Sequence, residues 1–305
     1  MTELIVQEVL NWLTLGSIYA LVAVGFSLLF GVLNIIHFSH GDVSLVSPFI
    51  ALALTQSLGA AVGAPASFGS FAVAALLAII LTGLLGVMLD ILVIQRFRNA
   101  PAMMALVATV ALGIVLREVV RNGFPNGSNP HPFPRIASGS LDVAGFTIPT
   151  FDLAAVLAAV LAVAALFFLL GNTRLGLHIK AVSQDRDAAR LMAISPSRIF
   201  RMTFFIASAV GAVGGLFFSS YAGMARFDFS IEVGLIGFSA AVVGGLGSMP
   251  GAIIGSLLIA GLDTLVQAVV ANGASYRLVF VFLLVIAVLV FRPSGLLGRA
   301  AIEKV

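Results

Sequence analysis

The sequence predicts an all-α polytopic membrane protein, and three observations indicate this fold class. Of the 305 residues, 60% are hydrophobic and only 10% are charged, whereas soluble domains average about 45–50% and about 25%. Apolar runs long enough to cross a bilayer recur along the chain, and basic residues concentrate between them. This composition leaves too little polar surface for a soluble enzyme or a disordered chain. A net charge of +3 is also too small for a nucleic-acid-binding surface.

Six segments have the composition of single membrane-spanning helices. A bilayer core about 30 Å thick requires roughly 20 apolar residues for each helix. The segments are 9–30, 71–94, 102–120, 151–170, 200–221 and 278–291.

Two further regions, 31–58 and 231–270, are expected to contain discontinuous helices. The stretch 43–58 is short and polar for a lipid-facing helix, since it includes Pro48 and Gln56. The second region is apolar but is interrupted by the sequence GGLGSMPG at 244–251, where we expect two shorter helices to meet. The total is about eight or nine transmembrane or partly spanning helices, depending on whether the short pieces cross.

The distribution of Lys and Arg predicts the orientation, because cytoplasmic connections carry an excess of basic residues. We expect a single transmembrane domain over residues 1–305, with a cytoplasmic loop at 172–198, an extracytoplasmic loop at 121–150 and a cytoplasmic C-terminus. The first 95 residues contain no Lys or Arg, so an uncleaved first helix with its N-terminus outside fits best. The basic residues assigned to the cytoplasmic side are Arg96, Arg98, Arg174, Lys180, Arg186, Arg190, Arg198, Arg201, Arg292, Arg299 and Lys304.

The loop at 172–198 is expected to contain a short helix. Asp185 and Asp187 would lie in its first turn, where the helix dipole favours acidic side chains. Pro196 cannot continue this helix, and Ser195 with Pro196 would begin the next one as N-cap and first helical residue.

Apolar residues on this short helix allow two interpretations. Leu191, Met192 and Ile194 form an apolar surface among charged neighbours. The helix could rest on the bilayer or on its own bundle, or it could dock into a groove on a soluble partner. The residues alone leave both possibilities open.

The segment from Gly176 to Ile194 resembles the cytoplasmic coupling loop of bacterial ABC-importer permeases, in the form carried by branched-chain amino acid permeases. The core in that family reads Asp-Ala-Ala-x-Leu-Met-Gly-Ile, and Ala193 stands here where the family usually has glycine. The resemblance implies that this core contacts the ATPase and transmits its motion. The corresponding residues are Asp187, Ala188, Ala189, Arg190, Leu191, Met192, Ala193 and Ile194.

Four other segments resemble the same family, at 16–21, 31–42, 244–252 and 291–298. The resemblance implies a permease subunit of an ABC importer in the bacterial cell inner membrane, moving branched-chain or related amino acids, or alternatively urea or short amides. The implied partners are a second homologous permease, two cytoplasmic ATP-binding subunits, a periplasmic substrate-binding protein and membrane lipid, without nucleic acid.

The sequence contains no phosphate-binding G-x-x-x-x-G-K-[ST] motif. We therefore expect a transport subunit that is not an enzyme and binds no cofactor, with ATP and magnesium held by partner subunits. No metal site is expected, because cysteine is absent and only four histidines occur. A stand-alone secondary carrier or channel for a small polar solute is the alternative, although no midplane cluster of acids or bases indicates proton coupling.

Polar residues within the apolar chain are candidates for the translocation pathway, since such groups are costly at membrane depth. Each also has a structural interpretation. Asp42 could cap a helix that begins near Val43, and the glycines at 244–247 could allow close helix crossing or expose backbone groups to a substrate. The candidates are Asn34, His37, His40, Asp42, Ser44, Gly244, Gly245 and Ser248.

Other small and charged residues near the spans are assigned structural roles. The Gly211/Gly215 and Gly251/Gly255 pairs are expected at helix crossings. Snorkelling near helix ends is expected for Asp90, Arg117 and Glu118. Asp263 lies deeper and would need a buried hydrogen bond or a subunit contact.

Overall fold

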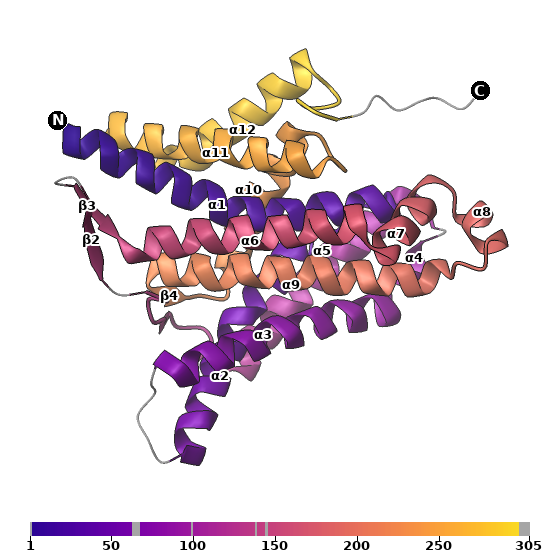
Figure 1. The fold of residues 1–305 in the computed structure, drawn as a ribbon, viewed down its shortest axis with the longest axis horizontal. Coiled ribbons are helices and arrows are strands. Elements are labelled where there is room, and N and C mark those ends of the chain that lie inside the picture. Colours follow the sequence, from indigo (N-terminus) through magenta and orange to yellow (C-terminus); the bar gives the residue numbers. More distant parts are fainter. Residues whose placement is uncertain (1, 63–67, 99, 138, 144–145, 299–305) are drawn as a thin grey trace.

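The computed structural model describes residues 2–62, 68–98, 100–137, 139–143 and 146–298. Eight of the described helices are long and apolar enough to cross a membrane, which confirms the predicted fold class. They are α1 (Thr2–Leu33), α2 (His40–Val62), α3 (Phe68–Leu89), α5 (Ala102–Gly123), α6 (Thr150–Asn172), α9 (Pro196–Ala222), α11 (Met249–Val269) and α12 (Gly273–Phe291). The long helices α1, α6 and α9 lie side by side along the long axis of the molecule, and α2 runs at a steep angle to them (Figure 1).

Shorter helices complete the helical part. A π-helical turn, η1 (Asp90–Ile94), and α4 (Gln95–Phe97) extend α3, and α10 (Phe229–Gly244) is the one apolar helix too short to count as a span among the described residues. The connection after α6 holds two helices, α7 (Arg174–Gln184) and α8 (Arg186–Leu191). The sequence predicted one short helix there, so α7 is an addition.

Two small antiparallel sheets lie in the connections. One pairs β1 (His131–Pro132) with β4 (Met224–Ala225), and the other is a hairpin of β2 (Ser140–Val143) and β3 (Phe146–Pro149). The sequence predicted only a loop at 121–150, which contains β1, β2 and β3. These strands are too short to show an alternating pattern of apolar and polar residues.

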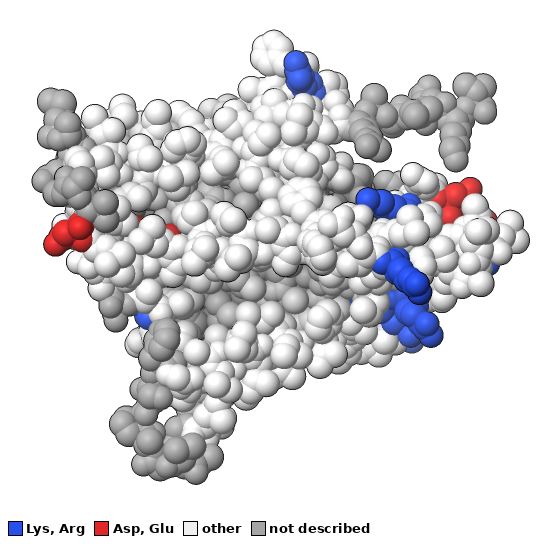
Figure 2. Space-filling view, viewed as in Figure 1, with Lys and Arg blue, Asp and Glu red and all other residues white. Residues whose placement is uncertain are grey.

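The bundle has two distinct ends. We call the end with β2, β3 and the start of α1 the hairpin end, and the end with α7 and α8 the α8 end (Figure 1). Basic side chains gather at the α8 end, and the middle of the visible face carries almost no charge (Figure 2). Arg299 and Lys304 lie outside the described residues. The described basic residues in the connections and helix ends at the α8 end are Arg96, Arg98, Arg174, Lys180, Arg186, Arg190, Arg198, Arg201 and Arg292.

The helices differ strongly in how far the rest of the chain covers them. In α1, 83% of the apolar segment is buried inside the protein, whereas in α12 the figure is 6%. α1 packs against α6, α9, α10 and α11 and forms the centre of the bundle. The exposed apolar surfaces of α5, α6 and α12 need lipid or another subunit to cover them.

Both predicted discontinuities are present. α1 ends at Leu33, and the chain turns through Asn34, whose φ of 55° is left-handed. α2 then begins inside the bundle, because the His40 ring lies against Gly25 and Gly211. The second break separates α10 from α11 and contains Gly245 and Gly247, with φ of 106° and 83°.

Three charged or capping assignments from the sequence are wrong. Asp42 is not an N-cap, because α2 begins at His40 and places Asp42 in the first turn. Arg117 does not extend to the surface but forms an ion pair with Asp42 at 3.2 Å. Asp90 is fully buried and pairs with Arg98.

The remaining structural assignments are confirmed. Asp263 is buried and accepts hydrogen bonds from Tyr19 at 3.0 Å and Gln267 at 2.8 Å. The glycine pairs lie at helix crossings. A Cβ at Gly215 would collide with the backbone of α2, and one at Gly255 would collide with the backbone of α10.

Candidate functional site

The segment α8 is a six-residue helix with a well-formed start. A side-chain oxygen of Asp185 accepts hydrogen bonds from the backbone N–H groups of Asp187 at 2.8 Å and Ala188 at 3.0 Å. These bonds satisfy donors that have no partner inside the helix. The sequence predicted Asp185 and Asp187 in the first turn; Asp187 lies there, whereas Asp185 is the N-cap residue, and the helix ends at Leu191 rather than at residue 194.

The end of α8 turns through Ala193, whose φ is 59°. The N–H of Ile194 donates to the carbonyl of Ala189, and the N–H of Ala193 donates to that of Arg190, both at 3.0 Å. This pattern is the Schellman motif, which favours glycine at the left-handed position. An alanine in this conformation costs about 1–2 kcal/mol, so Ala193 stands where a glycine would fit with less strain.

Two large apolar side chains project from this turn. Ala189 is 3% exposed and packs into the protein, whereas Leu191 is 89% exposed and Met192 is 76% exposed. Beside them, Arg190 pairs with Asp187 at 3.0 Å on the surface. Within the described residues, the bundle does not cover Leu191 and Met192, which argues against α8 resting on its own bundle through them.

The base of α8 is attached to the first helix break. Arg186 donates a hydrogen bond from Nη2 to the carbonyl oxygen of Leu33 at 2.6 Å. Its guanidinium lies 5.2 Å from the centre of the Phe200 ring, and that of Arg98 lies 4.3 Å from the same ring. The Arg186 side chain therefore connects α8 with both the end of α1 and the start of α9.

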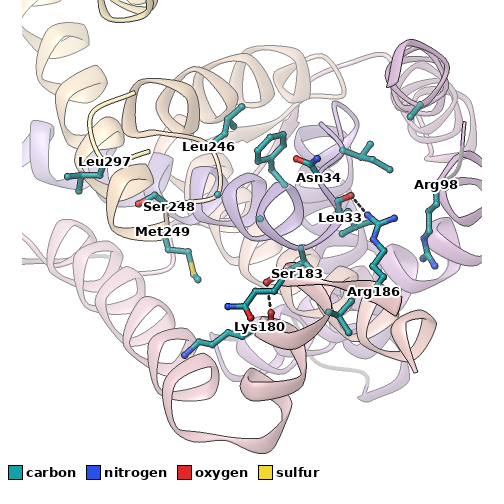
Figure 3. A pocket seen from close by; sticks show the side chains of 18 of the residues that line it. Leu33, Asn34, Arg98, Lys180, Ser183, Arg186, Leu246, Ser248, Met249 and Leu297 are labelled. Atoms are coloured by element: carbon teal, nitrogen blue, oxygen red, sulfur yellow. Dashed lines mark hydrogen bonds between the residues drawn. The ribbon is translucent and has the colours of Figure 1, made fainter. Parts of the chain in front are cut away.

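A cavity of about 1180 Å³ lies beside this contact, at the α8 end. Both helix breaks line it: Asn34 comes from the break after α1, and Ser248 comes from the break before α11. Figure 3 shows Arg186 beside Leu33 at the right of this cavity, Ser248 with Met249 at the left, and Lys180 below them. Ser248 also caps α11 by accepting a hydrogen bond from the N–H of Gly251 at 3.2 Å.

Three candidate pathway residues lie in helix packing, away from this cavity. The rings of His37 and His40 make edge contacts with Phe204 and Phe26, at 5.2 and 4.8 Å between ring centres. Ser44 donates to the carbonyl of His40 at 2.8 Å.

The glycines of the second break allow neighbouring backbone segments to approach closely. Gly244 packs its backbone against Gly251, where a Cβ would collide. Gly245, with its positive φ, contacts Gly298, and nearby N–H groups of Leu296 and Leu297 pair with the carbonyls of Val243 and Gly244 at 2.9 Å. The segment after α12 thus packs against the break between α10 and α11.

Asp42 lies at a different place, with partners that sequence reasoning missed. It pairs with Arg117 from α5 and accepts a hydrogen bond of 2.6 Å from the hydroxyl of Ser230 on α10. The signal that could have found Arg117 is its position inside an otherwise apolar segment, where an ionisable residue is a functional candidate. Ser230 carried no such signal.

No group of three or more His, Asp or Glu side chains that could hold a metal ion occurs among the residues with described positions. The binding of ATP and magnesium by partner subunits stays a prediction.

Comparison with known proteins identifies the family. A family described as "Branched-chain amino acid transport system / permease component" matches residues 8–289. The chain belongs to this family. The segment α8, the helix breaks and the Asp42–Arg117 pair all lie within the matched residues. With eight described helices long and apolar enough to cross a membrane, the chain is a multi-pass membrane protein.

Individual relatives align over nearly their whole length. The high-affinity branched-chain amino acid transport system permease protein LivH of Salmonella typhimurium is 30% identical over 304 residues, covering 98% of this chain and 97% of that protein. The corresponding permease protein BraD of Pseudomonas aeruginosa is 29% identical with the same coverage. Among solved structures, PsaBC from Streptococcus pneumoniae in complex with Fab aligns with a TM-score of 0.46 at 13% identity, covering 92% of this chain and 90% of that one.

Proposed function

We propose that this chain is the transmembrane permease subunit of an ABC importer that moves branched-chain amino acids inward. The observation that carries the proposal is the family match over residues 8–289. The full-length alignment to permeases of branched-chain amino acid transport systems supports the substrate class. As a transport subunit, the chain relies on ATP and magnesium bound by its partners.

In this proposal, α8 is the contact with the ATPase. The residues from Asp187 to Ile194 present an exposed apolar pair, Leu191 and Met192, flanked by charged side chains. An apolar projection with a charged rim fits a groove on a soluble partner. Arg186 then passes displacement of α8 to the end of α1, because it bonds directly to Leu33.

The cavity at the α8 end is the cytoplasmic part of the pathway. Both helix breaks line this cavity, which supports the assignment, because discontinuous helices border the solute route in many transporters. Asn34 and Ser248 face it directly. His37, His40, Ser44, Gly244 and Gly245 act by holding the broken helices in position, and Asp42 belongs to a separate part of the pathway.

The distribution of basic residues supports an orientation with the α8 end in the cytoplasm and the N-terminus outside. A second homologous permease covers part of the apolar surface that this chain leaves exposed. Two ATP-binding subunits dock at the α8 end, and a periplasmic substrate-binding protein docks at the hairpin end.

Two experiments test this function together. The tagged chain is purified from its native host in mild detergent, and the proteins that co-elute are identified by mass spectrometry. The complex is then reconstituted in proteoliposomes, and uptake of leucine, urea and acetamide is measured with ATP or with an ion gradient. ATP-dependent leucine uptake by a complex with ATPase and second permease is the expected result. Uptake by the chain alone, driven by an ion gradient, would establish a secondary carrier instead.

A further inference from the structure

The beginnings of two helices meet beside a buried ion pair. α2 starts at His40 and α10 starts at Phe229, and Gly41 packs its backbone against Gly234. The carboxylate of Asp42 lies at this junction, where it accepts a hydrogen bond from Ser230. The positive ends of two helix dipoles therefore lie near this junction.

Arg117 adds a full positive charge to the junction. Its Nε lies 3.2 Å from a carboxylate oxygen of Asp42 and 3.4 Å from the carbonyl oxygen of Gly113. A guanidinium carries five N–H donors, and in the described chain the hydrogen bond of Arg117 to Gly113 and its ion contact with Asp42 both use Nε. Donors suited to a bidentate carboxylate contact are therefore still available.

The pair lies inside the bundle, nearer the hairpin end than the α8 end. Arg117 precedes the end of α5 at Gly123 by less than two turns, about 9 Å. The side chains of Asp42 and Arg117 are only 10% and 21% exposed. A buried pair of this kind contributes little to stability over an apolar replacement, so stability alone is a weak reason for its presence.

A pocket of about 120 Å³ opens beside the pair. Its charged lining is Asp42 and Arg117, and its apolar lining includes Val110, Ile231 and Leu235. A carboxylate, a guanidinium and aliphatic side chains thus share one small space. An α-amino acid with a branched aliphatic side chain has the complementary groups: an ammonium, a carboxylate and an apolar end.

We infer that Asp42, Arg117 and Ser230 bind the zwitterionic end of a branched-chain amino acid in the outer half of the pathway. Arg117 takes the carboxylate, Asp42 takes the ammonium, and Ser230 orients Asp42. The aliphatic side chain lies against Val110 and Ile231. This assignment rests on the proposed import function and names a binding site within it.

A purely structural ion pair predicts a different mutational pattern from a binding site. If the pair only held α2 and α5 together, Asp42→Asn or Arg117→Gln would leave one buried charge unpaired, and the double variant would restore function by removing both. If the pair binds substrate, the double variant stays defective. Arg121→Gln is the control, because Arg121 lies one turn further along α5 with its side chain 45% exposed.

The test uses the complete importer, with partners, in proteoliposomes. Leucine transported per ATP hydrolysed is measured together with ATP hydrolysis stimulated by the substrate-binding protein. We expect both single variants and the double variant to lose at least about tenfold in leucine per ATP while ATP hydrolysis persists, and Arg121→Gln to match the wild type. A double variant with wild-type transport would overturn the site, as would single variants with unchanged transport.

A second measurement needs no variant. A leucine analogue with a photoreactive diazirine in its side chain is transported by the wild-type complex and cross-linked during turnover, and labelled peptides are mapped. Label on the segments around Val110 and Ile231 supports the site, whereas label confined to the cavity at the α8 end overturns it. If the wild-type complex imports no branched-chain amino acid, the proposed function itself has failed and this assignment fails with it.

Discussion

Arg186 on α8 donates a hydrogen bond of 2.6 Å to the carbonyl oxygen of Leu33, the last residue of α1. A helix leaves its final carbonyls without internal partners, and a cation near that end is favoured by the helix dipole. The bond therefore satisfies an acceptor at the first helix break and connects it to the segment that we assign to ATPase contact. Displacement of α8 is therefore transmitted directly to the first helix break, after Leu33.

Replacing Arg186 by glutamine should uncouple transport from ATP hydrolysis. A hydrogen bond from a charged donor contributes about 1.5–3 kcal/mol, and its loss should lower leucine transported per ATP by roughly tenfold or more. The ATPase should still co-purify, because Leu191 and Met192 are unchanged. The control is Arg198→Gln, which changes an exposed arginine at the start of α9, outside the contact that we assign to the ATPase. Equal coupling in Arg186→Gln and the wild type would contradict the role of Arg186.

An acidic residue at either exposed apolar position of α8 should disrupt the partner contact. Leu191→Asp or Met192→Asp should abolish uptake and loosen ATPase association, since burying a carboxylate in an apolar groove is costly. Membrane insertion should be intact, because neither side chain packs inside the bundle. Co-purification of the ATPase and leucine uptake provide the two measurements.

The conservative variants Leu191→Met and Met192→Leu serve as controls for these substitutions. They keep the apolar volume and should retain both association and uptake. Normal transport by Leu191→Asp and Met192→Asp would rule out a coupling role for this part of α8.

The strained turn at Ala193 should respond to side-chain size. Ala193→Gly should raise the stability of the purified permease by about 1 kcal/mol, because glycine adopts the left-handed conformation without the Cβ penalty. Ala193→Val should lower it, since a β-branched residue is disfavoured at positive φ. The melting temperatures of the three proteins should therefore rank glycine, alanine, valine. The reverse ranking would show that this turn does not control stability.

The second break should not tolerate a side chain at Gly244. A Cβ there would overlap the backbone of Gly251, and neither backbone can move without separating α10 from α11. Gly244→Ala should therefore destabilise the protein by about 3 kcal/mol or more, measured as a lower melting temperature and a loss of monodisperse protein. Gly171→Ala is the matched control, because no atom lies within 4 Å of the added Cβ. Similar behaviour of the two variants would show that the close approach is unimportant.

The sequence alone determined the features that depend on local composition. Runs of about 20 apolar residues can only be placed in a bilayer, so the spanning helices followed directly. The acidic residues Asp185 and Asp187 marked the start of α8, and Pro196 marked that of α9, because the helix dipole and proline geometry act within one turn. The GGLGSMPG run marked the second break for the same reason, and the pattern around Leu191 indicated the family that the comparison then established.

Tertiary structure alone decided which distant residues meet. Ser230 bonds to Asp42 across 188 positions of sequence, and Arg186 bonds to Leu33 across 153. These pairs form only after α2, α8 and α10 are packed, and no local propensity encodes that packing. Arg117 is an example of a contact that the sequence did not predict. Because it lies near the end of an apolar helix, it was expected to reach the surface, but the carboxylate of Asp42 at the start of α2 lies beside it. Local physics sets where the helices begin and end, while long-range packing sets which of their polar groups become a site.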